Sequence, residues 1–147
     1  MREILFKAKR IDNGEWVEGY FVKGKETPSV IFTNIDSCIA ECFEFEEVDE
    51  STICQYTGLT DCNGNKIWEG DIVRLTRNEG YNARKGKKLE VYFNEFLCHF
   101  ALSLKDSTSY PKNGSFDYLT LSGKKAKSME VIGNIFDNAE LLGGGEE

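Results

Sequence analysis

The sequence has little proline or histidine and no long apolar run. Its 147 residues include two prolines and one histidine. Charged or polar residues interrupt every apolar stretch well before the length of about 20 residues that a membrane-spanning helix needs. The first seven residues, Met1–Lys7, contain only a three-residue apolar run before a lysine, so they do not have the core of a signal peptide. We therefore expect a cytoplasmic protein with no membrane contact.

The five cysteines are an odd number, so they cannot all pair within one chain. Reduced thiols in a cytosol are the simpler interpretation. A zinc site is one alternative, but only Cys38 and Cys42 have the short spacing of a metal knuckle, and seven residues lie between Cys54 and Cys62. The single His99 lies far along the chain from all four. We expect no metal and no cofactor.

Catalytic arrangements are equally poorly supported. Cys98 and His99 are neighbours on an expected strand, so their side chains point to opposite faces and cannot form a dyad. Cys54 or Cys62 with His99 remains a possible dyad, and acids that share a strand face, such as Glu44 and Glu46, remain a possible general acid and base. A solvated acidic face explains the acids more simply, so we expect no catalytic residue and no enzyme activity.

Alternating apolar and polar residues dominate the chain, which indicates strands. Asn-Gly pairs at Asn13-Gly14 and Asn63-Gly64 are strong hairpin signals between such runs. A third hairpin is expected to turn at Asn94-Glu95, and residues 49–53 can form one helical turn. The expected strands cover residues 3–10, 15–22, 29–33, 42–48, 55–59, 66–68, 72–75, 89–93, 96–102 and 129–134, with loops at 76–86 and 105–115 and an uncertain segment at 116–121.

The alternation also assigns side chains to faces. In the second expected strand, Trp16, Glu18, Tyr20 and Val22 share one face, and Val17, Gly19 and Phe21 share the other. In the strand at 42–48, Phe43, Phe45 and Glu47 share a face. Many short strands, turns that contain glycine and the lack of a long amphipathic helix predict a mainly β protein, either a sandwich or a small barrel.

Several segments together resemble the YopX family of small proteins from bacteriophages and prophages. The segments that carry the resemblance are Arg2–Lys9, Gly14–Tyr20, Gln55–Asp61, Asn63-Gly64, Ile67–Val73 and Glu130–Asn138. The resemblance implies an SH3-like small β-barrel with an N-terminal β-hairpin region, in a bacterial host cell. It implies no activity, cofactor or catalytic residue. We expect a single domain over residues 1–142, with a hairpin region at about 1–53, a barrel region at about 54–142 and a flexible tail at 143–147.

Charge is strongly segregated along the chain, whose net charge is −7. Residues 27–65 contain eight acids and no base, whereas residues 74–88 contain six bases and one acid. The basic stretch lies mostly in an expected loop and includes an aromatic residue. Its candidate contact residues are Arg74, Arg77, Tyr81, Arg84, Lys85, Lys87 and Lys88. The candidate acidic partner face consists of Glu41, Glu44, Glu46 and Glu47.

Two functions fit this segregation. The first is a non-enzymatic binding or assembly module that forms a homo-oligomer, in which the acidic strand of one copy meets the basic loop of another, because complementary patches guide association. A phage or host protein is another possible partner. The second is a nucleic-acid-binding accessory factor that uses residues 74–88 for phosphate contacts and Tyr81 for base stacking. The net negative charge disfavours the second function as a general property of the chain.

Overall fold

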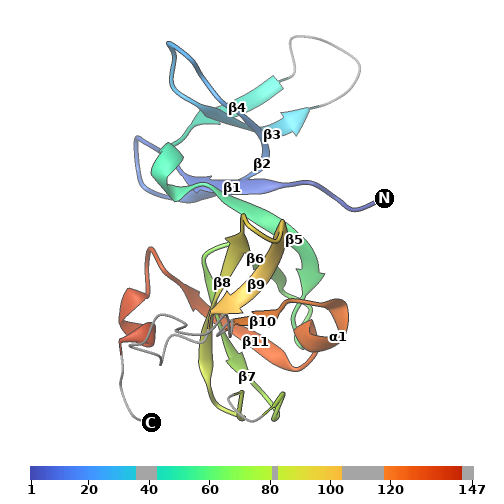
Figure 1. Cartoon of the computed structure of the whole chain (residues 1–147). Coiled ribbons are helices and arrows are strands. Elements are labelled where there is room, and N and C mark those ends of the chain that lie inside the picture. Colours follow the sequence, from blue (N-terminus) through green and yellow to red (C-terminus); the bar gives the residue numbers. More distant parts are fainter. Residues whose placement is uncertain (36–42, 81–82, 104–117, 144–147) are drawn as a thin grey trace. The chain divides into compact units, whose positions relative to one another are not determined.

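The structure is a computed structural model of the chain that describes residues 1–35, 43–80, 83–103 and 118–143. The chain divides into two compact units, Met1–Tyr56 and Thr57–Glu147, and Figure 1 labels their elements. Both units consist of antiparallel strands joined by turns, so the chain is mainly β as the alternation of the sequence predicts. In the described part of the chain, no helix has the length and apolar character to cross a membrane.

The first unit is an antiparallel sheet with the strand order β4-β3-β2-β1-β5. The hairpin predicted around Asn13-Gly14 is confirmed, because Lys9 pairs with Trp16 across it and Gly14 has a φ of 71°, which suits glycine. The elements are β1 (Phe6–Lys9), β2 (Trp16–Val22), β3 (Val30–Ile35), β4 (Phe43–Glu47), the 3-10 turn η1 (Glu50–Thr52) and β5 (Cys54–Thr60), which continues into the second unit.

The two faces of β2 differ as the sequence predicts. Gly19 is buried on the inner face, where a Cβ atom would lie 2.0 Å from the carbonyl oxygen of Phe32, so only glycine fits. Tyr20 is exposed on the outer face. The inner face covers a small core whose members are Ala8, Ile31 and Val48, with Val17, Phe21 and Ile53 packed against them.

The sheet of the first unit closes on itself just beyond β1 and β4. Val48 forms an antiparallel bridge with Arg10. The Ile11 N–H donates to the Glu47 carbonyl oxygen at 3.1 Å, and the Asp49 N–H donates to the Lys9 carbonyl oxygen at 2.9 Å. The chain then enters η1, whose N-cap Asp49 accepts the Ser51 N–H. This closure encloses the small core and leaves the outer face of the sheet bare.

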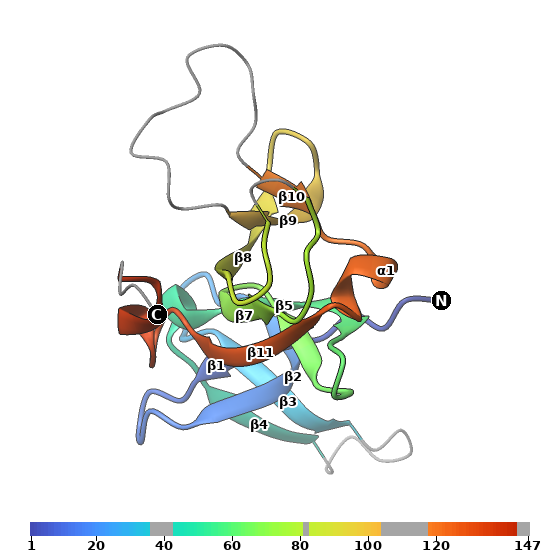
Figure 2. The ribbon, with the colours of Figure 1, turned by 90° about the horizontal axis from the view of Figure 1, so that it is seen from below.

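The second unit contains the remainder of β5, its hairpin partner β6, and a five-stranded sheet with the order β10-β9-β8-β7-β11. In Figure 2, β7 and β11 lie side by side, and the pairing of Val73 with Val131 agrees. The elements are β6 (Lys66–Trp68), β7 (Asp71–Leu75), β8 (Lys88–Asn94), β9 (His99–Ser103), β10 (Tyr118–Thr120), the short helix α1 (Gly123–Ala126), β11 (Met129–Asn134) and the 3-10 turn η2 (Ala139–Leu142).

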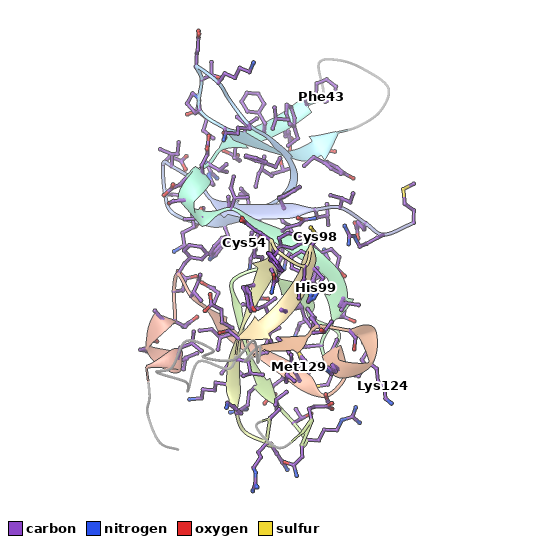
Figure 3. The ribbon with its side chains drawn as sticks, in the orientation of Figure 1. Phe43, Cys54, Cys98, His99, Lys124 and Met129 are labelled. Atoms are coloured by element: carbon purple, nitrogen blue, oxygen red, sulfur yellow. The ribbon has the colours of Figure 1, made fainter. Side chains whose placement is uncertain are left out.

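The second unit has the larger core. Leu75, Leu89 and Leu102 are at most 1% exposed, and Met129 is fully buried beneath the short helix (Figure 3). The segment between β7 and β8 is a loop, as predicted, and its Ala83 is buried in this core. The full set of buried core residues is Ile67, Val73, Leu75, Ala83, Leu89, Val91, Leu102, Leu121, Ala126 and Met129.

Two buried carboxylates hold the turns of the second unit. The fully buried Asp61 accepts backbone N–H groups from Asn63, Asn65 and Val131, each at 2.9 Å. Burial by itself raises the pKa of Asp61, but the N–H donors outweigh this effect and hold that pKa below its usual value. Asp71 accepts the Trp68 N–H at 2.8 Å, which holds the bend between β6 and β7.

The turn predicted at Asn94-Glu95 is misplaced. Asn94 pairs with His99, and residues 95–98 form the turn between β8 and β9. The Asn94 side chain accepts the Leu97 N–H at 3.0 Å, which draws the next residues out of the strand. Cys98, expected on a strand, instead lies in the turn, where it is exposed and has a φ of 55°.

The described strands do not establish the closed barrel that the family resemblance implies. The five-strand order ends at β10 and β11, and within the described residues these two strands are not paired with each other. The structure therefore supports two antiparallel sheets. The predicted loop at 105–115 lies outside the described residues.

Candidate functional site

A strip of exposed aromatic side chains crosses the outer face of the first unit. Tyr20 in β2 pairs with Phe32 in β3, which pairs with Phe45 in β4. The Phe32 ring lies 5.7 Å from that of Phe45 and 6.1 Å from that of Phe43. Tyr20, Phe43 and Phe45 are each between 45% and 53% exposed. We call Tyr20, Phe32, Phe43 and Phe45 the aromatic strip; Figure 3 labels Phe43 at the start of β4.

Lysine side chains already bind an aromatic ring on the same face. The Nζ atoms of Lys7 and Lys9 lie 4.8 Å and 5.4 Å from the centre of the Trp16 ring. Such contacts are attractive because the face of the ring is electron-rich. The outer face of the first unit therefore has the chemistry to bind cationic side chains.

The acidic residues of β4 alternate with its aromatic residues. Glu46 forms an ion pair with Arg10 at 3.1 Å, and Arg10 also binds Asp12 at 2.6 Å. The hydrogen bond to Asp12 is the largest of the effects that raise the pKa of Arg10. Glu44 and Glu47 are exposed and form no ion pair within the described ranges. Glu41, the fourth acid of the predicted partner face, lies outside the described residues.

The loop between β7 and β8, residues 76–87, contains most of the predicted basic stretch 74–88 and is held to the second unit by its backbone. The Glu79 N–H donates to the Ala83 carbonyl oxygen at 2.7 Å, and the Gly86 N–H donates to the Leu75 carbonyl oxygen at 2.7 Å. The Asn78 side chain accepts the Lys85 N–H at 2.9 Å. Together with the buried Ala83, these bonds fix the positions of the loop backbone on either side of residues 81–82.

Two of the predicted contact bases are neutralised by acids. Arg74 forms an ion pair with Glu130, with its Nε 2.8 Å from the carboxylate, and Arg77 contacts Glu79 at 2.7 Å. Polar contacts with the Ser128 side chain and then with Arg77 hold the pKa of Glu79 below its usual value. These two arginines are therefore poorer contact candidates than the sequence indicates.

The remaining bases of the stretch are less constrained. Arg84 and Lys85 are exposed, and their side chains have no ion pair within the part of the chain that the structure describes. Lys87 is half-buried, and Lys88 begins β8 opposite Arg74. Tyr81, the predicted stacking residue, lies outside the described residues.

A second basic segment that the sequence reasoning missed lies against this loop. The Thr76 N–H donates to the Ser128 carbonyl oxygen at 2.8 Å, which joins the loop to the end of α1. The positive charge of Lys125 contributes to the low pKa of Glu79. The signal was present in the sequence as the run Gly123–Lys127, which contains three lysines, but only the fold brings it to the loop.

The candidate thiol and imidazole groups are spread over separate elements. Cys54 is buried and donates to the Thr52 carbonyl oxygen at 3.3 Å, whereas Cys62 and Cys98 are exposed. The Nδ1 of His99 lies 3.0 Å from the Phe100 carbonyl oxygen. Among the described residues, no three His, Cys, Asp or Glu side chains gather as metal ligands. Cys38 and Cys42 lie outside those residues.

An open hollow of about 440 Å³ lies in the first unit, beside the bridge between Arg10 and Val48. The Ser29 hydroxyl, which lies in its lining, donates to Glu50 and accepts the Gly24 N–H at 3.0 Å. Its polar groups are therefore used to hold the loop before β3. Neither Glu44 nor His99 belongs to its lining, which comprises Lys9, Arg10, Ile11, Gly14, Pro28, Ser29, Val48, Asp49 and Glu50.

Comparison with known proteins gives a family and a fold. The sequence model described as YopX protein matches residues 5–143. A search of curated proteins found no match. The crystal structure of protein EF1440 from Enterococcus faecalis is similar, with a TM-score of 0.57 and 24% sequence identity, over 97% of this chain and 99% of that one. At this identity the likeness supports the fold alone.

Proposed function

The chain belongs to the YopX family, and from that premise we propose that it is a non-enzymatic assembly module that binds further copies of itself. The observation that carries the proposal is the aromatic strip with its neighbouring acids. Side chains about half exposed, gathered on one face of a sheet, are typical of a surface that a partner covers. Glu47 shares the face of β4 with Phe43 and Phe45. Glu44 is exposed on the opposite face of this strand, which is the last in the sheet order, so apolar area and negative charge meet along β4.

The basic loop of a second copy is the partner that fits this surface best. Arg84 and Lys85 are exposed, and a guanidinium or ammonium group can bind a carboxylate and an aromatic face together. The contacts of Lys7 and Lys9 with Trp16 are an example of a cation over an aromatic face within the chain. Charge favours the pairing, because residues 1–56 contain 12 acids and 6 bases, whereas the loop is basic.

The two surfaces belong to different units, so the contact between copies is head-to-tail. A contact of this kind produces a ring if it closes and an open chain if it does not. Two matching copies of the aromatic strip would instead bring the acids of β4 together, which costs free energy. The proposal therefore predicts an assembly that grows with concentration and weakens with salt.

Charge reversal tests the proposal. Variant A carries Glu44→Lys and Glu47→Lys, and variant B carries Arg84→Glu and Lys85→Glu. Each variant keeps one intact surface and should be a monomer by itself in light scattering. An equimolar mixture should assemble, because both the intact and the charge-reversed surfaces of A and B are complementary. Glu95→Lys with Glu140→Lys makes the same change in net charge on exposed acids elsewhere and should assemble like the wild type.

Three outcomes would overturn the proposal. The first is a wild type that is a monomer at tens of micromolar and low salt. The second is assembly of variants A and B to the same extent as the wild type. The third is a mixture of A and B that stays monomeric. Circular dichroism of each variant checks that it is folded.

The proposal also covers the fold of the second unit, the origin of the gene and the compartment. An SH3-like barrel in the second unit fits the strand order, in which the last strand returns beside the first after a short helical segment. The family resemblance favours a phage or prophage gene, and exposed thiols at Cys62 and Cys98 favour the cytoplasm of the bacterial host. A role without catalysis fits the use of Asp61 and Asp71 to hold turns.

A further inference from the structure

The second unit has a basic surface built from two segments that are far apart in the sequence. The loop 76–87 contributes Arg84 and Lys85, and α1 contributes Lys124 and Lys125. The hydrogen bond from the Thr76 N–H to the Ser128 carbonyl oxygen joins the segments. Figure 3 shows Lys124 pointing away from the ribbon into solvent.

Both segments are anchored to the core, so the cations project from a fixed base. Ala83 precedes Arg84 and is 1% exposed, and Ala126 follows Lys125 and is fully buried. Both alanines belong to the core cluster of the second unit. The Ser122 side chain also accepts the Lys125 N–H at 3.3 Å, which caps α1.

Glu79, the acid of the loop that lies near α1, already forms an ion pair. Glu79 binds Arg77 at 2.7 Å, and its side chain is only 15% exposed. The negative charge of Glu79 is therefore largely neutralised by Arg77, and the exposed groups around Glu79 are positive. A surface with excess positive charge from two elements matches a linear polyanion better than a single carboxylate.

We propose that Arg84, Lys85, Lys124 and Lys125 bind the phosphodiester backbone of nucleic acid. The contacts are to phosphates, because ammonium and guanidinium groups on an exposed surface pair with phosphate oxygens. Binding is therefore independent of base sequence and falls steeply with salt, since bound counterions are released. This proposal does not rest on self-association, although both use Arg84 and Lys85.

Fluorescence anisotropy with a labelled 20-base-pair DNA duplex and a labelled 20-nucleotide RNA, each at 50 and 200 mM salt, tests the proposal. Four phosphate contacts give a slope of about −3.6 in log affinity against log salt for the duplex, which is a loss of about 150-fold over this range. Lys124→Gln with Lys125→Gln should bring the slope to about −1.8, and Arg84→Gln with Lys85→Gln should do the same. Lys23→Gln with Lys25→Gln, on exposed lysines of the first unit, is the matched control and should leave the slope unchanged.

The DNA duplex and the RNA share a phosphodiester backbone, and the two probes show which nucleic acid the surface binds. Binding of either one supports the proposal. Lack of binding to both at 50 mM salt overturns it, as does an equal effect of the control pair and the two test pairs. The outcome is separable from self-association. Variant A should lose assembly and keep nucleic-acid binding, whereas Lys124→Gln with Lys125→Gln should weaken binding, with the halved slope, and keep assembly.

Discussion

The carboxylate of Asp61 accepts the backbone N–H of Val131 at 2.9 Å, across 70 residues of sequence. The same carboxylate accepts N–H groups from Asn63 and Asn65, so one buried side chain holds a local turn and fixes it to the last strand of the sheet. Buried charge in proteins is tolerated when it is hydrogen-bonded in this way.

Asp61→Ala should lower the free energy of unfolding by about 2–4 kcal/mol, because three backbone N–H groups lose their buried acceptor. Urea unfolding followed by tryptophan fluorescence measures the change. Asp12→Ala removes an exposed carboxylate bound to Arg10 and should cost less than about 1 kcal/mol. Equal losses in the two variants would contradict the role given to Asp61.

The lowered pKa of Asp61 gives its contribution a defined pH dependence. A carboxylate whose folded pKa lies below its unfolded value of about 3.9 stabilises the fold fully above that value. The stabilisation is lost as pH falls through the folded pKa. The stability difference between the wild type and Asp61→Asn should therefore be constant from pH 7 to pH 5 and shrink below pH 4. Urea unfolding at pH 7, 5 and 3 measures it, and a constant difference at all three would refute this prediction.

Gly19→Ala should destabilise the first unit by about 2 kcal/mol or more, because the new methyl group would overlap the Phe32 carbonyl. Gly123→Ala is the matched control. Its methyl group would meet only a Leu59 methyl at 3.7 Å, and alanine favours α1, so stability should stay the same or rise slightly. Thermal unfolding of both variants gives the comparison, and a Gly19→Ala variant as stable as the control would show that β2 and β3 lie further apart.

Phe43→Ser with Phe45→Ser should abolish self-association and change stability by less than about 1 kcal/mol, since both rings are about half exposed. Phe96→Ser removes a ring that is 87% exposed in the turn between β8 and β9 and should leave assembly intact. Sedimentation velocity of the three proteins separates the outcomes. Assembly that survives in the double variant would exclude the aromatic strip as the contact.

Thiol reactivity should follow burial. In a variant with Cys38→Ser and Cys42→Ser, two thiols should react rapidly with a chromogenic disulfide reagent, because Cys62 and Cys98 are exposed. Cys54 is 2% exposed and should react only on unfolding. The absorbance of the released chromophore gives the number of reacted thiols per chain. Three rapidly reacting thiols would show that Cys54 is accessible.

Local signals in the sequence predicted the strands and most turns. The alternation around Tyr20 and the Asn-Gly pair before it predict β2 and its hairpin, because both depend on residues close in sequence. The position of the turn after β8 was wrong, since the Asn94 side chain bonds the Leu97 N–H and competes with the strand pattern.

Features that depend on distant residues were not predictable in the same way. The aromatic strip needs the register of three strands, which joins Tyr20 to Phe45 through Phe32. The basic surface needs the contact of Thr76 with Ser128. The sequence predicted the charge of the loop but not that Arg74 and Arg77 would be neutralised by acids, one of which lies 56 residues away.

The pairing of β7 with β11 sets an order of events during synthesis. The first unit closes with the bridge between Arg10 and Val48, so it can finish folding while the remainder of the chain is still being made. β7 cannot complete its pairing before Val131 has been synthesised. One edge of β7 therefore stays unpaired until β11 leaves the ribosome. During that interval the nascent chain presents an apolar strand edge, and the charged residues of the following loop protect it from pairing with other chains.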